Sequence, residues 1–236
     1  VENNLTQNDI NSMTATYGTK LKDLSLDALA GYNVRGTWQW VNPEDTVGNV
    51  TVGNAYNQHS IKFVPTDSNY APKTGLYVNV AVKATAIALP TLTNSFVYNG
   101  SVQKPEIPVS DDYSVYAWSN ENSTNVANNY TVTLKLSDEN YAWSGTGTGA
   151  SVSGLDATYT YAITKATLTV TENKVQTATY GDKVVEKLTL PVSTFNGTVV
   201  GSWKWNIAEG TTVGNYGETN YFEAVCTLSE AEKVNF

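Results

Sequence analysis

Few side chains in this sequence have the type and spacing that catalysis requires. His59 is the only histidine and Cys226 the only cysteine among 236 residues, so neither a zinc cluster nor a catalytic triad is expected. The acidic residues near turns show no pair that a cleft would hold for glycoside hydrolysis. These residues are Glu44, Asp45, Asp111, Asp112 and Asp182. The sequence therefore predicts a non-catalytic protein without a cofactor or a metal site.

Aromatic side chains offer a different chemistry, the stacking of sugar rings. Trp38 and Trp40 lie two apart, as do Trp203 and Trp205, so each pair projects from one face of a strand. Such a pair either forms an exposed surface on which sugar rings stack or packs inside a hydrophobic core. Because both pairs recur with the same spacing from a glycine, we favour the core.

The middle of the chain contains aromatic residues that do not match these pairs. The partners considered are host or extracellular glycans or proteins. If the protein binds glycans, these aromatic residues are the predicted ligand-binding residues. They are Tyr113, Tyr116, Trp118 and Trp143.

A short element, Asp-x-Asn-Tyr-Ala, occurs at residues 67–71 and 138–142. An Asp side chain accepts hydrogen bonds from backbone N–H groups two residues on, and Asn tolerates the left-handed conformation. We therefore expect a chain corner whose tyrosine turns inward, as in the tyrosine corner of immunoglobulin-like sandwiches. Calcium binding at Asp67 or Asp138 is the alternative, but no acidic residues at alternate positions accompany them.

The elements that must position these residues repeat along the chain. The sequence TATYG at residues 14–18 returns at 177–181, GTWQW at 36–40 returns as GSWKW at 201–205, and TVGN at 46–49 returns at 212–215. A fixed spacing of this kind is the signature of a repeat architecture. Residues present in each copy are expected to build each unit, not to form one unique active site.

Composition and alternation indicate the fold class. Only 15% of the residues are charged, whereas Thr, Val, Tyr, Asn and Gly are abundant, which favours strands joined by turns. Apolar residues alternate at Leu76, Val78, Val80 and Val82, the period of a strand. Helix signals are weak, and residues 21–24 and 184–188 are each expected to form a single turn.

Charge excludes some partners. The net charge is −8 without a basic run, which disfavours nucleic acid and anionic membranes. No stretch approaches 18 apolar residues, so membrane insertion is not expected.

A second repeat, Lys-Ala-Thr at residues 83–85 and 165–167, locates the joints. It predicts domains at 1–82, 83–165 and 166–236, with strands running through joints that have no flexible linker, as in a stiff rod. The third domain is expected to lack its last strand, because Asn235-Phe236 stands in the Asn-Tyr place of the corner. The chain is expected to be a monomeric segment of a longer polypeptide.

Two patterns resemble a known family. The first consists of YNGSVQKP at residues 98–105, NYTVTL at 129–134 and DENY at 138–141, and it resembles the YDG/MBG-type repeats of bacterial surface proteins. The second consists of Tyr17-Gly18, GTWQW at 36–40, VGN at 47–49 and FVPTDSNY at 63–70, and it is similar to the companion repeat. The resemblance implies tandem extracellular modules of adhesin-like proteins at the bacterial cell surface, and it supplies no catalytic residues.

Together these observations predict an all-β chain of three small immunoglobulin-like β-sandwich domains in tandem, with β-grasp-like repeats as the alternative. The predicted function is a non-catalytic stalk that displays or spaces other domains. The alternative function is a glycan- or mucin-binding module.

Overall fold

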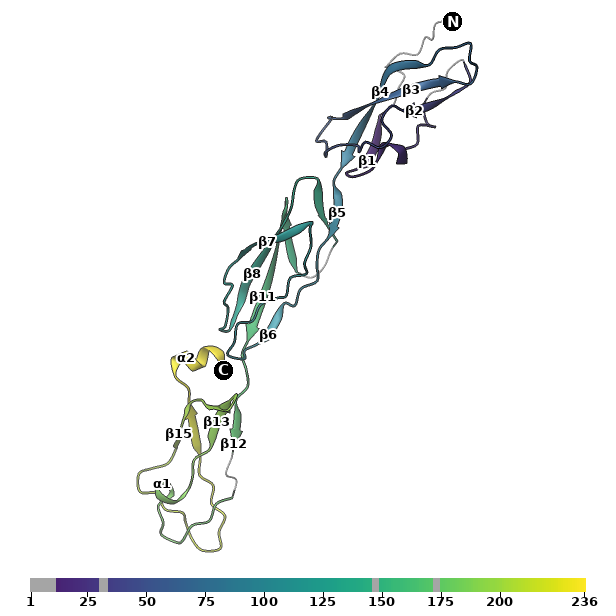
Figure 1. Ribbon diagram of the computed structural model, residues 1–236. Coiled ribbons are helices and arrows are strands. Elements are labelled where there is room, and N and C mark those ends of the chain that lie inside the picture. The colour runs from purple at the N-terminus through teal and green to yellow at the C-terminus, as the bar shows by residue number, and fades with distance from the viewer. Residues whose placement is uncertain (1–11, 30–33, 146–148, 172–174) are drawn as a thin grey trace. The chain divides into compact units, whose positions relative to one another are not determined.

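A computed structural model describes residues 12–29, 34–145, 149–171 and 175–236 (Figure 1). Strands far outweigh helices in this part of the chain, which confirms the all-β prediction. The helical elements are the 3-10 helix η2 (Leu21–Asp23), α1 (Val184–Lys187) and α2 (Glu230–Asn235). Among the described residues, no helix has the length and apolar character needed to cross a bilayer.

The described residues form sixteen strands. In order, they are β1 (Met13–Thr16), β2 (Gly36–Trp40), β3 (Asn57–Pro65), β4 (Lys73–Lys83), β5 (Thr85–Ala88), β6 (Ser95–Val97), β7 (Tyr113–Trp118), β8 (Ala127–Leu136), β9 (Tyr141–Ser144), β10 (Ala150–Ser153), β11 (Asp156–Thr164), β12 (Thr169–Thr171), β13 (Val192–Phe195), β14 (Thr198–Val199), β15 (Ser202–Trp205) and β16 (Ala224–Thr227).

The chain forms two compact units. The first contains the residues up to Thr91 together with Ile107–Ala117 and Val132–Tyr159, and the second contains Leu92–Glu106, Trp118–Thr131 and Thr160–Phe236. The predicted domain boundaries at 82/83 and 165/166 fall inside these units, so the division into three domains stays a prediction. Below, the N-terminal region is residues 12–83, the middle region 84–165 and the C-terminal region 166–236.

The N-terminal region is built on one sheet with the strand order β1-β4-β3-β2. The pairs β2–β3 and β3–β4 are antiparallel, whereas β1 is parallel to β4. The alternation predicted along β4 is confirmed, because Leu76, Val78, Val80 and Val82 are all buried, as one face of a pleated strand requires. The core around them also contains Ala15, Leu21, Leu26, Leu29, Trp40, Val47 and Ile61.

A single helical turn covers this core, as the sequence predicts. Leu21, at the start of η2, is buried in the core cluster. The turn before it depends on Gly18, whose φ of +86° is a conformation that glycine adopts readily. A β-bridge between Lys20 and Thr46 then ties the turn to the loop that follows β2.

The middle region contains a sheet with the strand order β10-β11-β8-β7, in which β6 is parallel to β11. A separate pair is formed by β5 and β9, which are also parallel. Buried side chains alternate along β8 and β11, as expected for strands with one face on a core. They are Val132, Leu134, Leu136, Ala157, Tyr159, Tyr161 and Ile163.

The C-terminal region repeats the local structure of the N-terminal region. Trp38 on β2 lies opposite Phe63 on β3, and Trp203 on β15 lies opposite Cys226 on β16. Cys226 therefore occupies in its strand pair the place that Phe63 occupies in the first. The turn at α1 is likewise tied by a bridge between Lys183 and Thr212.

The glycine before each tryptophan pair is needed for packing. A Cβ on Gly36 would lie 2.4 Å from the carbonyl oxygen of Val64, and a Cβ on Gly201 would lie 2.7 Å from Cys226 Sγ. At Gly36 the added Cβ would clash with backbone, whereas at Gly201 the Cys226 side chain would have to shift and the φ of +73° also favours glycine. The recurring glycine is therefore a requirement of each strand pair.

The two regions differ at one sheet edge. In the N-terminal region β3 lies between β2 and β4, whereas in the described C-terminal region β16 pairs only with β15. The residues before Phe236 form α2, which begins with a capping box between Ser229 and Glu232. This helix was not predicted, although Ser-x-x-Glu at residues 229–232 is the sequence signal of a capping box.

The corner prediction is correct in one respect and wrong in another. The backbone N–H of Asn69 donates to Asp67 Oδ1 at 2.9 Å, and that of Asn140 donates to Asp138 Oδ1 at 2.6 Å, as expected. The expected left-handed conformation of the corner asparagine is wrong. Among the described non-glycine residues only Asn196 has a positive φ, so neither Asn69 nor Asn140 adopts it. The Asp hydrogen bond closes the corner without that conformation.

Candidate interaction sites

Within the first unit, the corner of the middle region contacts the N-terminal region through an asparagine. Asn140 Oδ1 accepts a hydrogen bond from the backbone N–H of Val50 at 2.8 Å. Its Nδ2 donates to Asn49 Oδ1 over 3.4 Å. The amide group therefore uses both of its ends on one dipeptide of the loop between β2 and β3.

The tyrosine of the same corner completes this contact. Tyr141 lies edge-on against Tyr17, with ring centroids 5.7 Å apart. Thr85, at the start of β5, donates its backbone N–H to the carbonyl oxygen of Asn140 and its hydroxyl to that of Tyr17. We call the set Tyr17, Asn49, Val50, Thr85, Asn140 and Tyr141 the first joint.

Within the second unit, the same contact occurs between the C-terminal and middle regions. Asn235 Oδ1 accepts from the backbone N–H of Val126 at 3.0 Å, and its Nδ2 donates to Asn125 Oδ1 over 3.4 Å. Phe236 lies edge-on against Tyr98 at 5.5 Å. The backbone N–H of Ala166 donates to the carbonyl oxygen of Asn235. We call these residues the second joint.

The two joints share most of their contacts, although α2 carries one asparagine and a turn carries the other. The hydroxyl bond of Thr85 has no counterpart, because an alanine, Ala166, stands in its place. Each joint uses an Asn-Val dipeptide, an asparagine followed by an aromatic residue, and a tyrosine. The joint tyrosines could have been found from the sequence, because Tyr17, Tyr98 and Tyr180 recur at spacings of 81 and 82 residues. The Asn-Tyr element was predicted only as a corner, and its contact with the preceding region was not predicted.

The residues predicted to bind glycans fall into separate groups. In the first unit Tyr113 and Trp143 lie against each other with centroids 5.3 Å apart, and the Trp143 indole N–H donates to the carbonyl oxygen of Leu155 at 2.8 Å. Tyr116 is 63% exposed, and Lys135 Nζ lies 4.6 Å from its ring centroid. Tyr116 therefore presents the most accessible ring of the first-unit candidates.

Trp118 belongs to the second unit and has its own contacts there. Lys104 Nζ lies 5.1 Å from its ring centroid. Its ring is also edge-on to Tyr161 at 6.3 Å. Trp118 is half-buried, and both contacts hold the indole within its own unit.

The first tryptophan pair belongs to a core, as predicted. Trp40 is only 8% exposed, and its indole N–H donates to the carbonyl oxygen of Leu24 at 3.1 Å. Trp38 packs edge-on against Phe63 and lies beside the same core. These contacts make the first pair part of the N-terminal interior.

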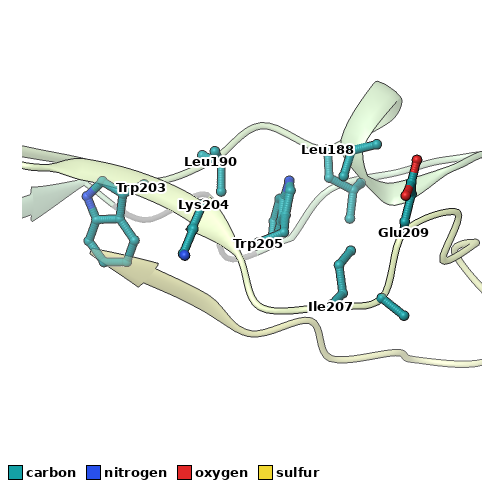
Figure 2. Close-up of a pocket in the computed structure, with 9 residues that line it drawn as sticks. Leu188, Leu190, Trp203, Lys204, Trp205, Ile207 and Glu209 are labelled. Atoms are coloured by element: carbon teal, nitrogen blue, oxygen red, sulfur yellow. The ribbon is translucent and has the colours of Figure 1, made fainter. Parts of the chain in front are cut away.

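The second tryptophan pair borders a pocket of about 430 Å³ in the C-terminal region. Figure 2 shows Trp205, Leu188 and Ile207 turned toward one space between β15 and the α1 turn. Trp203 lines the same pocket and donates its indole N–H to Ser193 Oγ at 2.7 Å. The counterpart of Trp205 in the N-terminal region is the buried Trp40, so the second pair is less completely covered than the first.

Electrostatic effects on the titratable groups are local. Burial raises the pKa of Tyr141, with a smaller contribution from neighbouring Tyr17. Burial also raises the pKa of Tyr113, assisted by the charge of Asp112. Hydrogen bonds from the Gly201 N–H and from Ser229 lower the pKa of Glu232. Each shift follows from packing at a joint, a strand or a helix cap.

The remaining candidate residues have structural contacts. His59 Nε2 lies 3.2 Å from the carbonyl oxygen of Val47, and its ring is edge-on to Trp40. Cys226 is a free, half-buried thiol 3.6 Å from Ser193 Oγ. In the described part of the chain, no three His, Cys, Asp or Glu side chains gather as metal ligands would.

Comparison with protein-family models, with curated proteins and with solved structures gave no match for this chain.

Proposed function

We propose that this chain is a non-catalytic, adhesin-like segment of a bacterial extracellular surface protein, in which it spaces or displays other domains. The observation that carries the proposal is the recurrence of one joint at two places, Asn140 on Val50 and Asn235 on Val126. A spacer requires that consecutive regions are fixed to each other. The two joints provide such contacts, one in each unit, although their sequences differ. Tandem immunoglobulin-like sandwiches are the proposed domain type.

The strand order of the N-terminal region supports the sandwich over the β-grasp alternative. Among the described residues, β1 lies at the edge of its sheet and pairs with β4 alone. In a β-grasp fold the first and last strands lie side by side within the sheet, each with a further neighbour. The edge position of β1 is thus closer to the first strand of an immunoglobulin-like sheet.

A distance measurement across the first joint tests the spacing function. In a Cys226→Ala background, Ser68 and Ser114, both exposed, are replaced by cysteine and spin-labelled. We expect a narrow distance distribution by double electron–electron resonance, because the joint contacts fix both sides. The double substitution Tyr17→Ala with Asn140→Ala should broaden it. A broad distribution in the parent chain would contradict the proposal.

The cell-surface assignment needs its own measurement in the organism that makes the protein. Protease treatment of intact cells should release peptides of this chain, detectable by mass spectrometry, before any cytoplasmic marker is cleaved. Release only after lysis would contradict an extracellular location.

A further inference from the structure

The two Asn-Gly dipeptides of this chain meet beside the second joint. They are Asn99-Gly100 in the middle region and Asn196-Gly197 in the C-terminal region, and the sequence contains no other. Asn196 Nδ2 donates to the backbone carbonyl oxygen of Asn99 at 3.1 Å. Both residues belong to the second unit, so this hydrogen bond adds to the contacts that hold its two regions together.

Aromatic packing places this contact next to the rings of the joint. Phe195, which precedes Asn196, stacks on Tyr98 with ring centroids 5.5 Å apart. Phe195 also lies edge-on against Phe236 at 5.0 Å. A change in the backbone at either asparagine therefore acts directly beside Tyr98 and Phe195.

Asparagine is a thermolabile residue, and a following glycine makes it more so. The glycine backbone nitrogen, after losing its proton, attacks the asparagine Cγ, and the bond from Cγ to the amide nitrogen breaks. That nitrogen takes up a proton and leaves as ammonia, which gives a succinimide ring. Water then opens the ring at either of its two carbonyl groups, so the product is aspartate or isoaspartate. Glycine favours the attack because it has no side chain to hinder it.

The side chain of Asn99 is folded back over the reacting segment. Its Oδ1 accepts a hydrogen bond from the backbone N–H of Ser101 at 2.8 Å, which is an Asx turn. The Gly100 nitrogen lies within the ring that this bond closes, so the attacking and attacked atoms stay close together. The same bond stabilises the negative charge that develops on Oδ1 during the attack. Asn99 and Gly100 are both exposed, so water reaches them.

Asn196 is held in a different way. It occupies the two-residue turn between β13 and β14, in which Phe195 pairs with Thr198. The φ of +49° at Asn196 and of +79° at Gly197 are those of the type I′ turn that Asn-Gly favours. Cyclisation at Asn196 must distort this turn and break the hydrogen bond to Asn99, so it is expected to be slower.

Asn120 provides a comparison within the same unit. Its Oδ1 accepts from the backbone N–H of Asn122 at 3.1 Å, the same Asx turn as at Asn99, and its side chain is also exposed. The next residue is Glu121, whose side chain hinders attack by its backbone nitrogen. Asn99 and Asn120 therefore differ chiefly in the residue that follows.

We propose that Asn99 is a site of spontaneous deamidation, and that its conversion to isoaspartate loosens the second joint. In isoaspartate the chain runs through the former side-chain carbon, so the backbone between Tyr98 and Gly100 is one carbon longer. The carbonyl group that accepts from Asn196 becomes a free carboxylate on a branch. The lengthened segment no longer holds Tyr98 in place against Phe195.

Ageing of the intact chain at neutral and at mildly alkaline pH tests the site. Peptide mapping by mass spectrometry, with isoaspartyl methyltransferase labelling, measures each asparagine. We expect conversion at Asn99 to be roughly tenfold or more faster than at Asn120 or Asn196, because attack from a poorly placed group is much slower. Conversion should be faster at the higher pH, since the Gly100 nitrogen must lose its proton. Equal rates at the three residues, or conversion first at Asn196, would overturn the proposal.

Concentrated urea separates the effect of sequence from that of structure. In the unfolded chain the Asx turn and the hairpin are absent, so Asn99 and Asn196 should convert at similar rates. If Asn196 stayed as slow in urea as in the folded chain, the protection assigned to its turn would be wrong.

Glu121→Gly is the matched variant for reactivity. It creates a further Asn-Gly dipeptide in an Asx turn, so Asn120 should then convert at a rate close to that of Asn99. Glu121 pairs with Lys104 at the surface, and the loss of such a pair costs little stability. An Asn120 that stays as slow as in the parent chain would reject the mechanism.

The effect on the joint is measured on the aged chain. Ion exchange separates the modified species, because it carries an additional negative charge. Amide exchange at Val126, whose N–H donates to Asn235, should be several times faster in the isoaspartate form. Freshly prepared Asn99→Asp adds the same charge without lengthening the backbone and should leave exchange at Val126 unchanged.

Two results would overturn the proposed loosening. One is equal exchange at Val126 in the parent chain and in the isoaspartate form, and the other is the same acceleration in Asn99→Asp. Neither result would alter the distances measured across the first joint, so the spacing function is tested separately.

Discussion

The side chain of Asn235 accepts a hydrogen bond from the backbone N–H of Val126, 109 residues earlier in the chain, at 3.0 Å. It does so from the end of a helix, whereas Asn140 makes the equivalent bond to Val50 from a strand-connecting corner. Two different local structures thus deliver an asparagine followed by an aromatic ring to the same kind of dipeptide. The contact, and not the element that carries it, is what the two joints have in common.

Asn140→Ala should weaken the first joint. The substitution leaves the Val50 N–H without its acceptor, which costs about 1–2 kcal/mol. We expect lower stability in urea and faster amide exchange at Val50. Asn69→Ala is the matched control, because Asn69 occupies the same place in a corner and its side chain bonds only to Asp67 among the described contacts. An equal exchange effect at Val50 from both variants would contradict the assigned role.

Trp40→Ala should destabilise the N-terminal region by about 3–5 kcal/mol, because it removes a large buried side chain and leaves a cavity. Trp205→Ala, at the equivalent but less covered position, should cost less. Denaturant titration followed by amide exchange in β3 and β16 separates the two regions. A greater cost for Trp205→Ala would show that the first pair is not the better packed one.

Stability of the C-terminal region should fall in acid through Glu232. Hydrogen bonds from Gly201 and Ser229 lower its pKa in the folded state. A carboxyl group with a lowered folded pKa contributes stability above its unfolded pKa, and this contribution is lost as the pH falls through the folded value. Glu232→Gln should flatten this pH dependence in urea titrations between pH 7 and pH 3. An unchanged slope would contradict a role for the cap.

The glycan-binding hypothesis makes a prediction at Tyr116. If exposed aromatic rings bind sugars, a glycan array should give a signal that Tyr116→Ala removes. Trp143→Ala should remove the signal and also lower the stability of the protein, because the Trp143 indole N–H donates to the carbonyl oxygen of Leu155. Tyr116→Phe is the control that keeps the ring. A signal unaffected by all three variants would exclude this surface.

Local patterns in the sequence predict strands and turns, because these elements depend on residues that are close to each other in the sequence. Alternation from Leu76 to Val82 requires one buried strand face, and Gly36 must be a glycine because its Cβ would meet the facing strand. Repeated spacing adds the alignment of Trp203 with Trp38. The register of Cys226 opposite Trp203 comes from the paired strands of the structure.

The joints were decided only by tertiary structure. Nothing near Asn140 in the sequence names Val50 as its partner, because a hydrogen bond across 90 residues depends on how both segments have folded. The same applies to the helix that brings Asn235 to Val126 and to the pocket beside Trp205. The sequence by itself determined the all-β character and the repeated parts, since these follow from side-chain period and spacing. Packing decided which surfaces those parts bury and which they leave open.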